Sequence, residues 1–158
     1  MDMDMDMDIG MNMGIDRNKS DRTIRRDDYE TYTELASVVQ EMDDSVDVVV
    51  VEGMHDKEAL KEMGITKEIA MYSCSGFSHV EFVDCLRRRH TCVAVLTDYD
   101  RAGKRYNKKL VALLEREGVK VEKRYREEIG KILGLRGMKS IESINSLRNK
   151  VFASQKLY

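Results

Sequence analysis

The sequence predicts an α/β fold, an open sheet of about four parallel strands with helices packed on both of its faces. Short apolar or β-branched runs alternate along the chain with stretches in which apolar residues recur at helical spacing. The 158 residues also suit one domain, because a chain of that length buries roughly two-thirds of its unfolded surface in a single core. Helices that alternate with parallel strands form right-handed crossovers, which cover both faces of the sheet.

The N-terminal part of the chain divides into a leader and a helix. Residues 1–26 are predicted to be a disordered acidic leader, because Met-Asp repeats four times over residues 1–8 and such spaced acids cannot settle into a core. Residues 27–45 predict an amphipathic helix, since their apolar side chains recur at three- and four-residue steps. These side chains belong to Tyr29, Tyr32, Leu35, Ala36, Val39 and Met42.

Four short runs predict the strands. Each run consists mainly of β-branched or other apolar residues, as do strands that are covered on both faces. The runs are residues 46–51, 69–72, 92–96 and 119–121. We expect the strand order 2-1-3-4, the flavodoxin-like order, in which the first and third strands are neighbours.

Helical patterns fill the intervals between the strands and continue past the last one. Ser78 and Glu81 are placed as a capping box at the start of one of them. The patterns cover residues 57–63, 78–89, 101–117, 125–133 and 140–150. We therefore expect a central α/β domain over residues 46–124 and a C-terminal helical extension over residues 125–158.

The net charge of −2 is the average of two opposite parts. Residues 1–47 hold 14 acidic and 5 basic side chains, a balance of −9. Of the 29 acidic and 27 basic side chains in the whole chain, 15 and 22 remain for residues 48–158, a balance of +7. A basic body is compatible with a phosphate-bearing partner. The near-neutral total therefore does not exclude RNA or DNA as a partner.

The composition excludes several classes of protein. No apolar run is long enough to span a bilayer and no signal peptide is recognisable, so we expect a cytoplasmic protein without a membrane partner. The three cysteines, Cys74, Cys85 and Cys92, form no Cys-x-x-Cys pair. This spacing disfavours a zinc site, and the odd number disfavours a disulfide framework.

Acidic residues follow the first and third predicted strands, where ligands bind in open parallel sheets. Glu52 comes directly after the first strand with Asp56 four residues further on, and Asp98 and Asp100 come after the third. Residues two apart in an extended segment face the same side, so Asp98 and Asp100 can converge. Glu52 lies near them if the two strands are neighbours.

Carboxylate oxygens are the ligands that Mg²⁺ prefers, and Mn²⁺ is a second candidate cation. Asp98 and Asp100 are the main candidate ligands, and Glu52 and Asp56 are further ones. A third carboxylate crowded against two others gains proton affinity, which suits Glu52 to general acid/base catalysis. The structural alternative is that these acids cap helices, because Asp56 and Asp100 stand where N-caps belong.

Basic residues follow the second acidic motif directly. Arg101, Lys104, Arg105 and Lys108 lie on or beside the polar face of the helix predicted over residues 101–117. They are candidates for binding the backbone of a polyanion. A solvated helix face is the alternative interpretation of the same run.

Two motifs carry a family resemblance. The segments Glu52-Gly53-x-x-Asp56 and Asp98-x-Asp100-x-Ala102-Gly103, about 45 residues apart within a short α/β pattern, resemble the motifs of the Toprim domain family. Their form is similar to that in the branch of the 5S ribosomal RNA maturases and bacterial primases. The leading helix, an Arg-rich segment and the Ser-Ile-Glu-Ser run at residues 140–143 also resemble the small stand-alone archaeal Toprim proteins.

The resemblance implies a Toprim/Rossmann-like sheet and Mg²⁺-dependent phosphodiester chemistry on RNA or DNA. It implies Glu52 as the general acid/base and Asp98 with Asp100 as metal ligands. Gly53 and Gly103 match the glycines of the family motifs, and Asp56 is a supporting metal candidate. We therefore expect a nuclease or an RNA- or DNA-processing enzyme.

Other functions fit the chain less well or stay open. It is too short for the gate and separate tyrosine domain of a topoisomerase, and its cysteines do not supply the zinc module of a primase. A non-catalytic nucleic-acid-binding Toprim module, in RNA processing or DNA repair or replication, is the main alternative. A phosphatase or nucleotidyltransferase that uses Asp98-x-Asp100, and a Cys74 nucleophile with His55 or His79, are the remaining ones.

Overall fold

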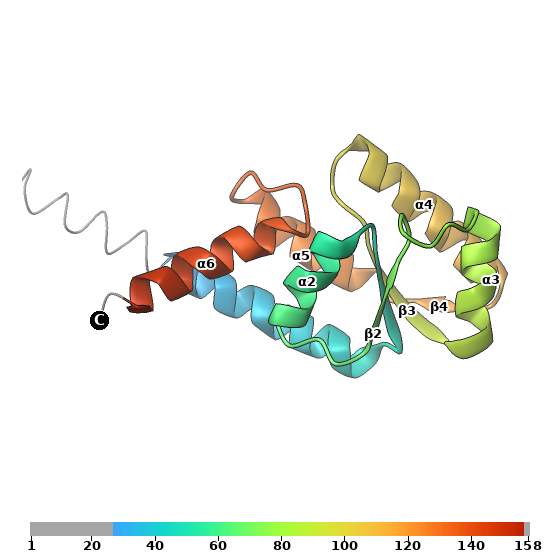
Figure 1. The fold of residues 1–158 in the computed structure, drawn as a ribbon, viewed down its shortest axis with the longest axis horizontal. Coiled ribbons are helices and arrows are strands. Elements are labelled where there is room, and N and C mark those ends of the chain that lie inside the picture. Colours follow the sequence, from blue (N-terminus) through green and yellow to red (C-terminus); the bar gives the residue numbers. More distant parts are fainter. Residues whose placement is uncertain (1–26, 157–158) are drawn as a thin grey trace, which may run out of the picture.

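The computed structural model describes residues 27–156, so the acidic leader predicted over residues 1–26 lies outside the described residues. The described chain forms a four-stranded parallel sheet with helices on both faces (Figure 1). The strand order is β2-β1-β3-β4. The predicted fold class and strand order are therefore confirmed.

The strands are short, and β1 is buried along its whole length. Their bounds are Val48–Val51 for β1, Glu68–Met71 for β2, Cys92–Leu96 for β3 and Lys120–Val121 for β4. Val51 lies opposite Met71 of β2 and Leu96 of β3. The segments that follow these residues therefore leave the sheet at one edge, its carboxyl edge.

A helix forms in every interval in which one is predicted, although the last one ends at residue 156 and not at the predicted residue 150. Residues 27–45 are helical, and the later helices are α2 Met54–Glu62, α3 His79–Arg89, α4 Arg101–Arg116, α5 Arg124–Gly134 and α6 Ser143–Lys156. The Ser78 half of the capping box predicted for α3 is present, because the Ser78 hydroxyl accepts a hydrogen bond from the Glu81 amide at 3.2 Å. Helix α6 begins three residues later than predicted, since residues 140–142 form a bend and turns instead.

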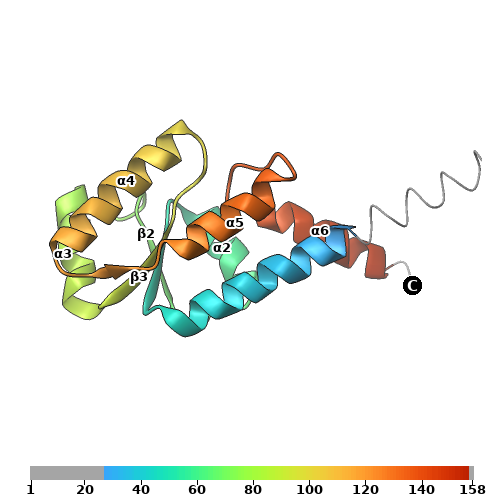
Figure 2. The same cartoon turned by 180° about the vertical axis from the view of Figure 1, so that it is seen from behind.

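Each face of the sheet carries its own apolar cluster. Helices α3 and α4 cover one face, where Phe82 and Leu110 pack with Val50. The N-terminal helix, α2, α5 and α6 cover the other face (Figure 2), and their cluster includes Leu35, Leu60, Ile129 and Leu147. The C-terminal helices therefore share a core with the sheet.

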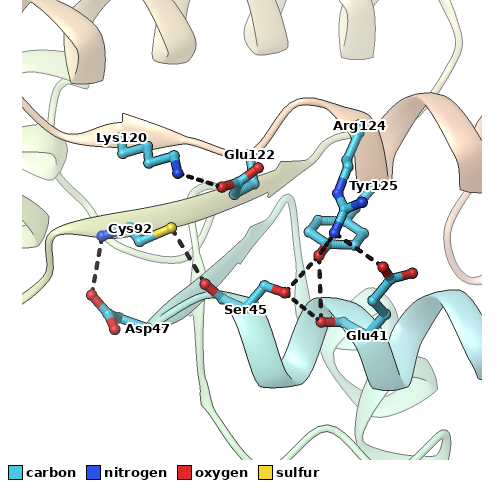
Figure 3. Close-up of polar contacts among 8 residues, drawn as sticks. All are labelled: Glu41, Ser45, Asp47, Cys92, Lys120, Glu122, Arg124 and Tyr125. Carbon is cyan, nitrogen blue, oxygen red and sulfur yellow. Dashed lines mark hydrogen bonds and ion pairs between the residues drawn. The ribbon is translucent and has the colours of Figure 1, made fainter.

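At the amino edge of the sheet, polar contacts join the N-terminal helix to α5 and β3 (Figure 3). The Tyr125 hydroxyl donates to the Ser45 hydroxyl at 2.7 Å, and Arg124 donates to Glu41 at 3.1 Å. The Asp47 carboxylate accepts from the Cys92 amide at 3.0 Å. These hydrogen bonds hold the N-terminal segment against α5 and β3 at the amino edge. The candidate site lies at the opposite, carboxyl edge.

Asp43 joins the N-terminal helix to the segment before β2, and its loss should destabilise the protein. Its side chain is 4% exposed and accepts from the Thr66 amide at 2.9 Å, the Thr66 hydroxyl at 2.7 Å and the Lys67 amide at 3.0 Å. Burial alone would raise the pKa of Asp43, but these bonds and the Lys67 charge outweigh it and lower the pKa. We expect Asp43→Ala to reduce the free energy of unfolding by about 2–3 kcal/mol in urea denaturation at neutral pH.

The lowered pKa of Asp43 also determines how its contribution to stability depends on pH. A group with a lowered folded pKa stabilises the fold above its unfolded pKa, and this stabilisation is lost as the pH falls through the folded pKa. The difference between wild type and Asp43→Ala should therefore shrink in acid. The exposed neighbour Asp44 provides the control. An equal loss in Asp44→Ala would contradict the assignment.

Candidate metal centre at the carboxyl edge

Three carboxylates from three segments converge at the carboxyl edge of the sheet. Glu52 directly follows β1, Asp56 lies in the first turn of α2, and Asp98 follows β3 by two residues. One carboxylate oxygen from each lies within 4.8 Å of the others. Within the described part of the chain, this is the one group of three or more His, Cys, Asp or Glu side chains so close together.

Among these three carboxyl groups, Glu52 has the largest change in pKa. Burial raises the pKa of Glu52 to about 7, together with a hydrogen bond and the charge of Asp98. The charges of Asp56 and Asp100 act in the same direction. The Oε1 atom of Glu52 is buried and has no hydrogen-bond partner among residues 27–156. Because an unpartnered buried oxygen is costly, this atom is suited to bind a proton or a cation.

Asp56 is fixed from two sides. Its side chain is 6% exposed and its Oδ2 accepts from the Gly53 amide at 3.2 Å. The main chain of Glu142 also hydrogen-bonds this carboxylate. Burial raises the pKa of Asp56, and the charge of Asp98 adds to the effect. Asp56 is therefore not the N-cap of α2 itself, but it caps this helix from position N3, where its carboxylate binds the amide of the N-cap Gly53.

Asp100 takes a different position from the one that the two-residue spacing predicts. Its Oδ1 accepts from the Gly103 amide at 2.7 Å, which makes Asp100 the N-cap of α4. The structure thus directs Asp98 towards Glu52 and Asp56, and Asp100 towards α4. The structural alternative applies to Asp100, although its charge still contributes to the pKa of Glu52.

The two motif glycines differ in their surroundings. A Cβ atom at Gly53 would meet nothing within 4 Å, and the residue has an extended backbone. A Cβ atom at Gly103 would lie 2.0 Å from the Asp98 carbonyl oxygen. Gly103 is therefore required by the close approach of α4 to Asp98, whereas nothing crowds a side chain at Gly53.

Two residues that the sequence analysis did not single out bind Asp98. The Ile141 amide donates to Asp98 Oδ1 at 2.9 Å, and Arg126 Nη2 donates to the Asp98 carbonyl oxygen at 2.7 Å. Ile141 belongs to the Ser-Ile-Glu-Ser run that entered the family resemblance. Arg126 lies in a mixed-charge segment that carries no motif, so the sequence offered no signal for it.

The predicted cations line one open groove beside the site. Arg101, Lys104, Arg105 and Lys108 are exposed on α4, and Lys139 from the segment before α6 joins them. The groove also contacts Tyr99 and Asp100. In the part of the chain that the structure describes, none of these five cations forms an ion pair with a carboxylate. Their charges are thus available to an external anion.

His55 and His79, the two histidines considered as partners of a Cys74 nucleophile, contact other residues. His79 Nε2 lies 2.6 Å from the Tyr72 hydroxyl, and His55 Nδ1 lies 3.8 Å from Glu58. Cys74 is exposed. The described contacts therefore give no support to a Cys74 nucleophile. No helix within residues 27–156 has the length and apolar character needed to cross a membrane.

Comparisons with known proteins give one family model, several curated relatives and one solved structure. A family model described as Toprim-like matches residues 49–131. A UPF0292 protein of Methanocaldococcus jannaschii is 30% identical over 129 residues, which are 80% of this chain and 98% of that protein. One of Thermococcus sibiricus is 32% identical over 118 residues, which are 75% and 90% of the two chains. A solved structure of a protein from Aquifex aeolicus is 30% identical with a TM-score of 0.53, and the match covers 73% of this chain and 95% of that one.

Proposed function

The chain belongs to the Toprim-like family, with the small archaeal UPF0292 proteins as its relatives, and on that premise we propose that it is a metal-dependent nuclease or RNA- or DNA-processing enzyme. The family suggests metal-dependent chemistry on nucleic acids. The observation that carries the proposal is the group of three carboxylates within 4.8 Å of one another. A groove of unpaired cations beside them supports a polyanionic substrate.

The donor set fits a divalent cation. Glu52, Asp56 and Asp98 offer only oxygen atoms, which Mg²⁺ and Mn²⁺ accept, and the unpartnered Oε1 of Glu52 gains a partner when a cation binds. A bound cation would supply Lewis-acid stabilisation of the charge that develops on the phosphoryl oxygens. The resemblance implies Asp100 as a further ligand; its Oδ1 binds the Gly103 amide, so Oδ2 is the oxygen that it would offer to a cation.

Glu52 is our proposed general acid/base. In the cation-free site the pKa of Glu52 is about 7, so its protonated and ionised forms are both populated near neutral pH. This is the condition under which a carboxyl group can accept a proton from an attacking oxygen or return one to a leaving oxygen. The cations Arg101, Lys104, Arg105 and Lys108 would hold the phosphate backbone next to it.

Cleavage assays with the full chain test the proposal. Labelled structured RNA and duplex DNA are incubated with the protein in Mg²⁺, in Mn²⁺ and in EDTA, and Asp98→Asn is compared with wild type. We expect products that need the metal and that Asp98→Asn does not form. Salt-sensitive retention of the nucleic acid without any product would instead establish the alternative, a non-catalytic nucleic-acid-binding module.

The cation groove should determine affinity and its salt dependence. We expect the double variant Lys104→Ala with Arg105→Ala to weaken binding of a labelled duplex, because each lost phosphate contact reduces the slope of log K against log salt by about 0.9. The measurement is a series of binding isotherms between low and moderate salt. Lys61→Ala with Lys131→Ala is the control, since both lysines are exposed in the last turns of other helices. An equal loss in the control pair would show that only net charge matters.

A further inference from the structure

The segment that carries Asp98 lies beyond the hydrogen bonding of the sheet. The pairing of β3 with β1 ends at Leu96, and its pairing with β4 involves only Cys92 and Val93. Among the described residues, no strand therefore pairs with the main chain at Thr97 and Asp98. The conformation of this segment decides where the Asp98 carboxylate points.

Arg126 of α5 supplies the missing contacts. Its Nη2 donates to the Asp98 carbonyl oxygen at 2.7 Å, and its Nε donates to the Thr97 carbonyl oxygen at 3.3 Å. Its guanidinium carbon lies 4.5 Å from the centre of the Tyr99 ring. In return, the Tyr99 hydroxyl donates to the Arg126 carbonyl oxygen at 2.7 Å. One side chain thus contacts three consecutive residues around Asp98.

The segment before α6 holds Asp98 from a second direction. The Lys139 carbonyl oxygen accepts from the Tyr99 amide at 2.7 Å, and the Ile141 amide donates to Asp98 Oδ1 at 2.9 Å. Helix α5 also packs closely against Tyr99, the residue between Asp98 and Asp100, because a Cβ atom at Gly130 would lie 2.6 Å from Tyr99 Cε1. Helix α5 and the segment before α6 therefore fix both the main chain and the carboxylate of Asp98.

The environment of Arg126 differs from that of other arginines in the protein. Arg124 and Arg136 are each paired with a carboxylate, of Glu41 and Asp28 respectively. Arg126 forms no ion pair within the described residues and is half-buried, with donors that bind main-chain carbonyl groups. A guanidinium keeps its charge under such conditions, and its planar fork can bind two acceptors at once. Arg126 therefore places a positive charge next to the main chain of Asp98.

We propose that Arg126 is a positioning residue of the metal centre, which holds Thr97 and Asp98 so that the Asp98 carboxylate faces Glu52 and Asp56. This inference rests on the proposed binding of a divalent cation. Residues that orient metal ligands typically change metal affinity by about 10–100-fold when they are replaced. Helix α5 thereby becomes part of the metal site.

Mn²⁺ binding measured on the full chain by electron paramagnetic resonance tests the inference without an activity assay. We expect Arg126→Ala to weaken Mn²⁺ binding by about 10–100-fold and added guanidinium ion, at concentrations well below denaturing ones, to restore part of it. Arg124→Ala is the control, because this neighbouring arginine binds Glu41 at the amino edge. It should bind Mn²⁺ like the wild type.

Arg126→Lys keeps the inference testable if Arg126→Ala does not fold. Lysine retains the charge but cannot donate to two carbonyl groups in the same geometry, so a folded Arg126→Lys should bind Mn²⁺ more weakly than the wild type. Wild-type affinity in a folded Arg126→Lys or Arg126→Ala would overturn the inference and leave the metal centre standing. A wild-type chain that binds no Mn²⁺ would overturn the metal centre and this inference with it.

Discussion

Glu52→Gln is expected to slow Mg²⁺-dependent cleavage of nucleic acid by about 10²–10⁴-fold, the usual contribution of a general acid or base. Glutamine preserves the shape of the side chain but can neither accept nor return a proton. It also replaces one of three carboxylates within 4.8 Å of one another, which weakens the donor set for the cation. Single-turnover cleavage at saturating Mg²⁺ separates the two effects, because high Mg²⁺ compensates for weaker binding only. Glu58→Gln, at an exposed position of α2, should cleave normally.

The same substitution should change how stability depends on pH in the metal-free protein. The folded pKa of Glu52 is raised from 4.5 to about 7, so the folded state binds more protons than the unfolded state between these values. Stability from this group is therefore present below the unfolded pKa and is lost as the pH rises through about 7. In EDTA, the thermal unfolding temperature of wild type should fall over this range, and that of Glu52→Gln should fall less, because the raised pKa of Asp56 remains in the variant. Identical pH profiles would contradict the assigned environment of Glu52.

The fold could be predicted because its signals are local and repeated. Val48–Val51 and Cys92–Leu96 are continuous apolar runs, and the helices between the strands are long enough to fix parallel crossovers. Strand order then followed from the flavodoxin-like pattern. The proximity of Glu52 and Asp98 could be predicted for the same reason, since the ends of neighbouring parallel strands meet at one edge.

The finer geometry of the site depends on contacts that sequence spacing does not encode. The prediction that Asp98 and Asp100 converge assumed an extended chain through Tyr99, but α4 begins at Arg101 and Asp100 serves as its cap. Asp56 joins the group because α2 starts at Met54, earlier than the predicted residue 57, and its first turn faces the strand ends. Arg126 and Ile141 reach Asp98 over separations of 28 and 43 residues, which no local pattern signals.

Gly103→Ala should be among the most damaging single-methyl changes at the site. A Cβ atom at this position would lie 2.0 Å from the Asp98 carbonyl oxygen and 2.5 Å from its carbonyl carbon. Both are main-chain atoms, so relief requires α4 to move away from the segment that Arg126 holds. That movement would also strain the bond from the Gly103 amide to Asp100 and the buried bond from the Thr97 hydroxyl to the Gly103 carbonyl oxygen.

We therefore expect Gly103→Ala to lower the free energy of unfolding by about 2–4 kcal/mol, from overpacking and a weakened cap, and to weaken Mn²⁺ binding. A Gly→Ala substitution inside a helix usually raises the free energy of unfolding, because alanine is preferred to glycine there by about 1 kcal/mol. At Gly103 we expect the opposite change. Gly134→Ala in the last turn of α5 is the control: its Cβ atom would meet nothing within 4 Å and its φ is not positive, so it should be neutral or stabilising. Urea unfolding and Mn²⁺ titration of both variants give the comparison. A Gly103→Ala chain as stable as Gly134→Ala would mean that α4 does not press on Asp98, and the close approach would then have no part in orienting that carboxylate.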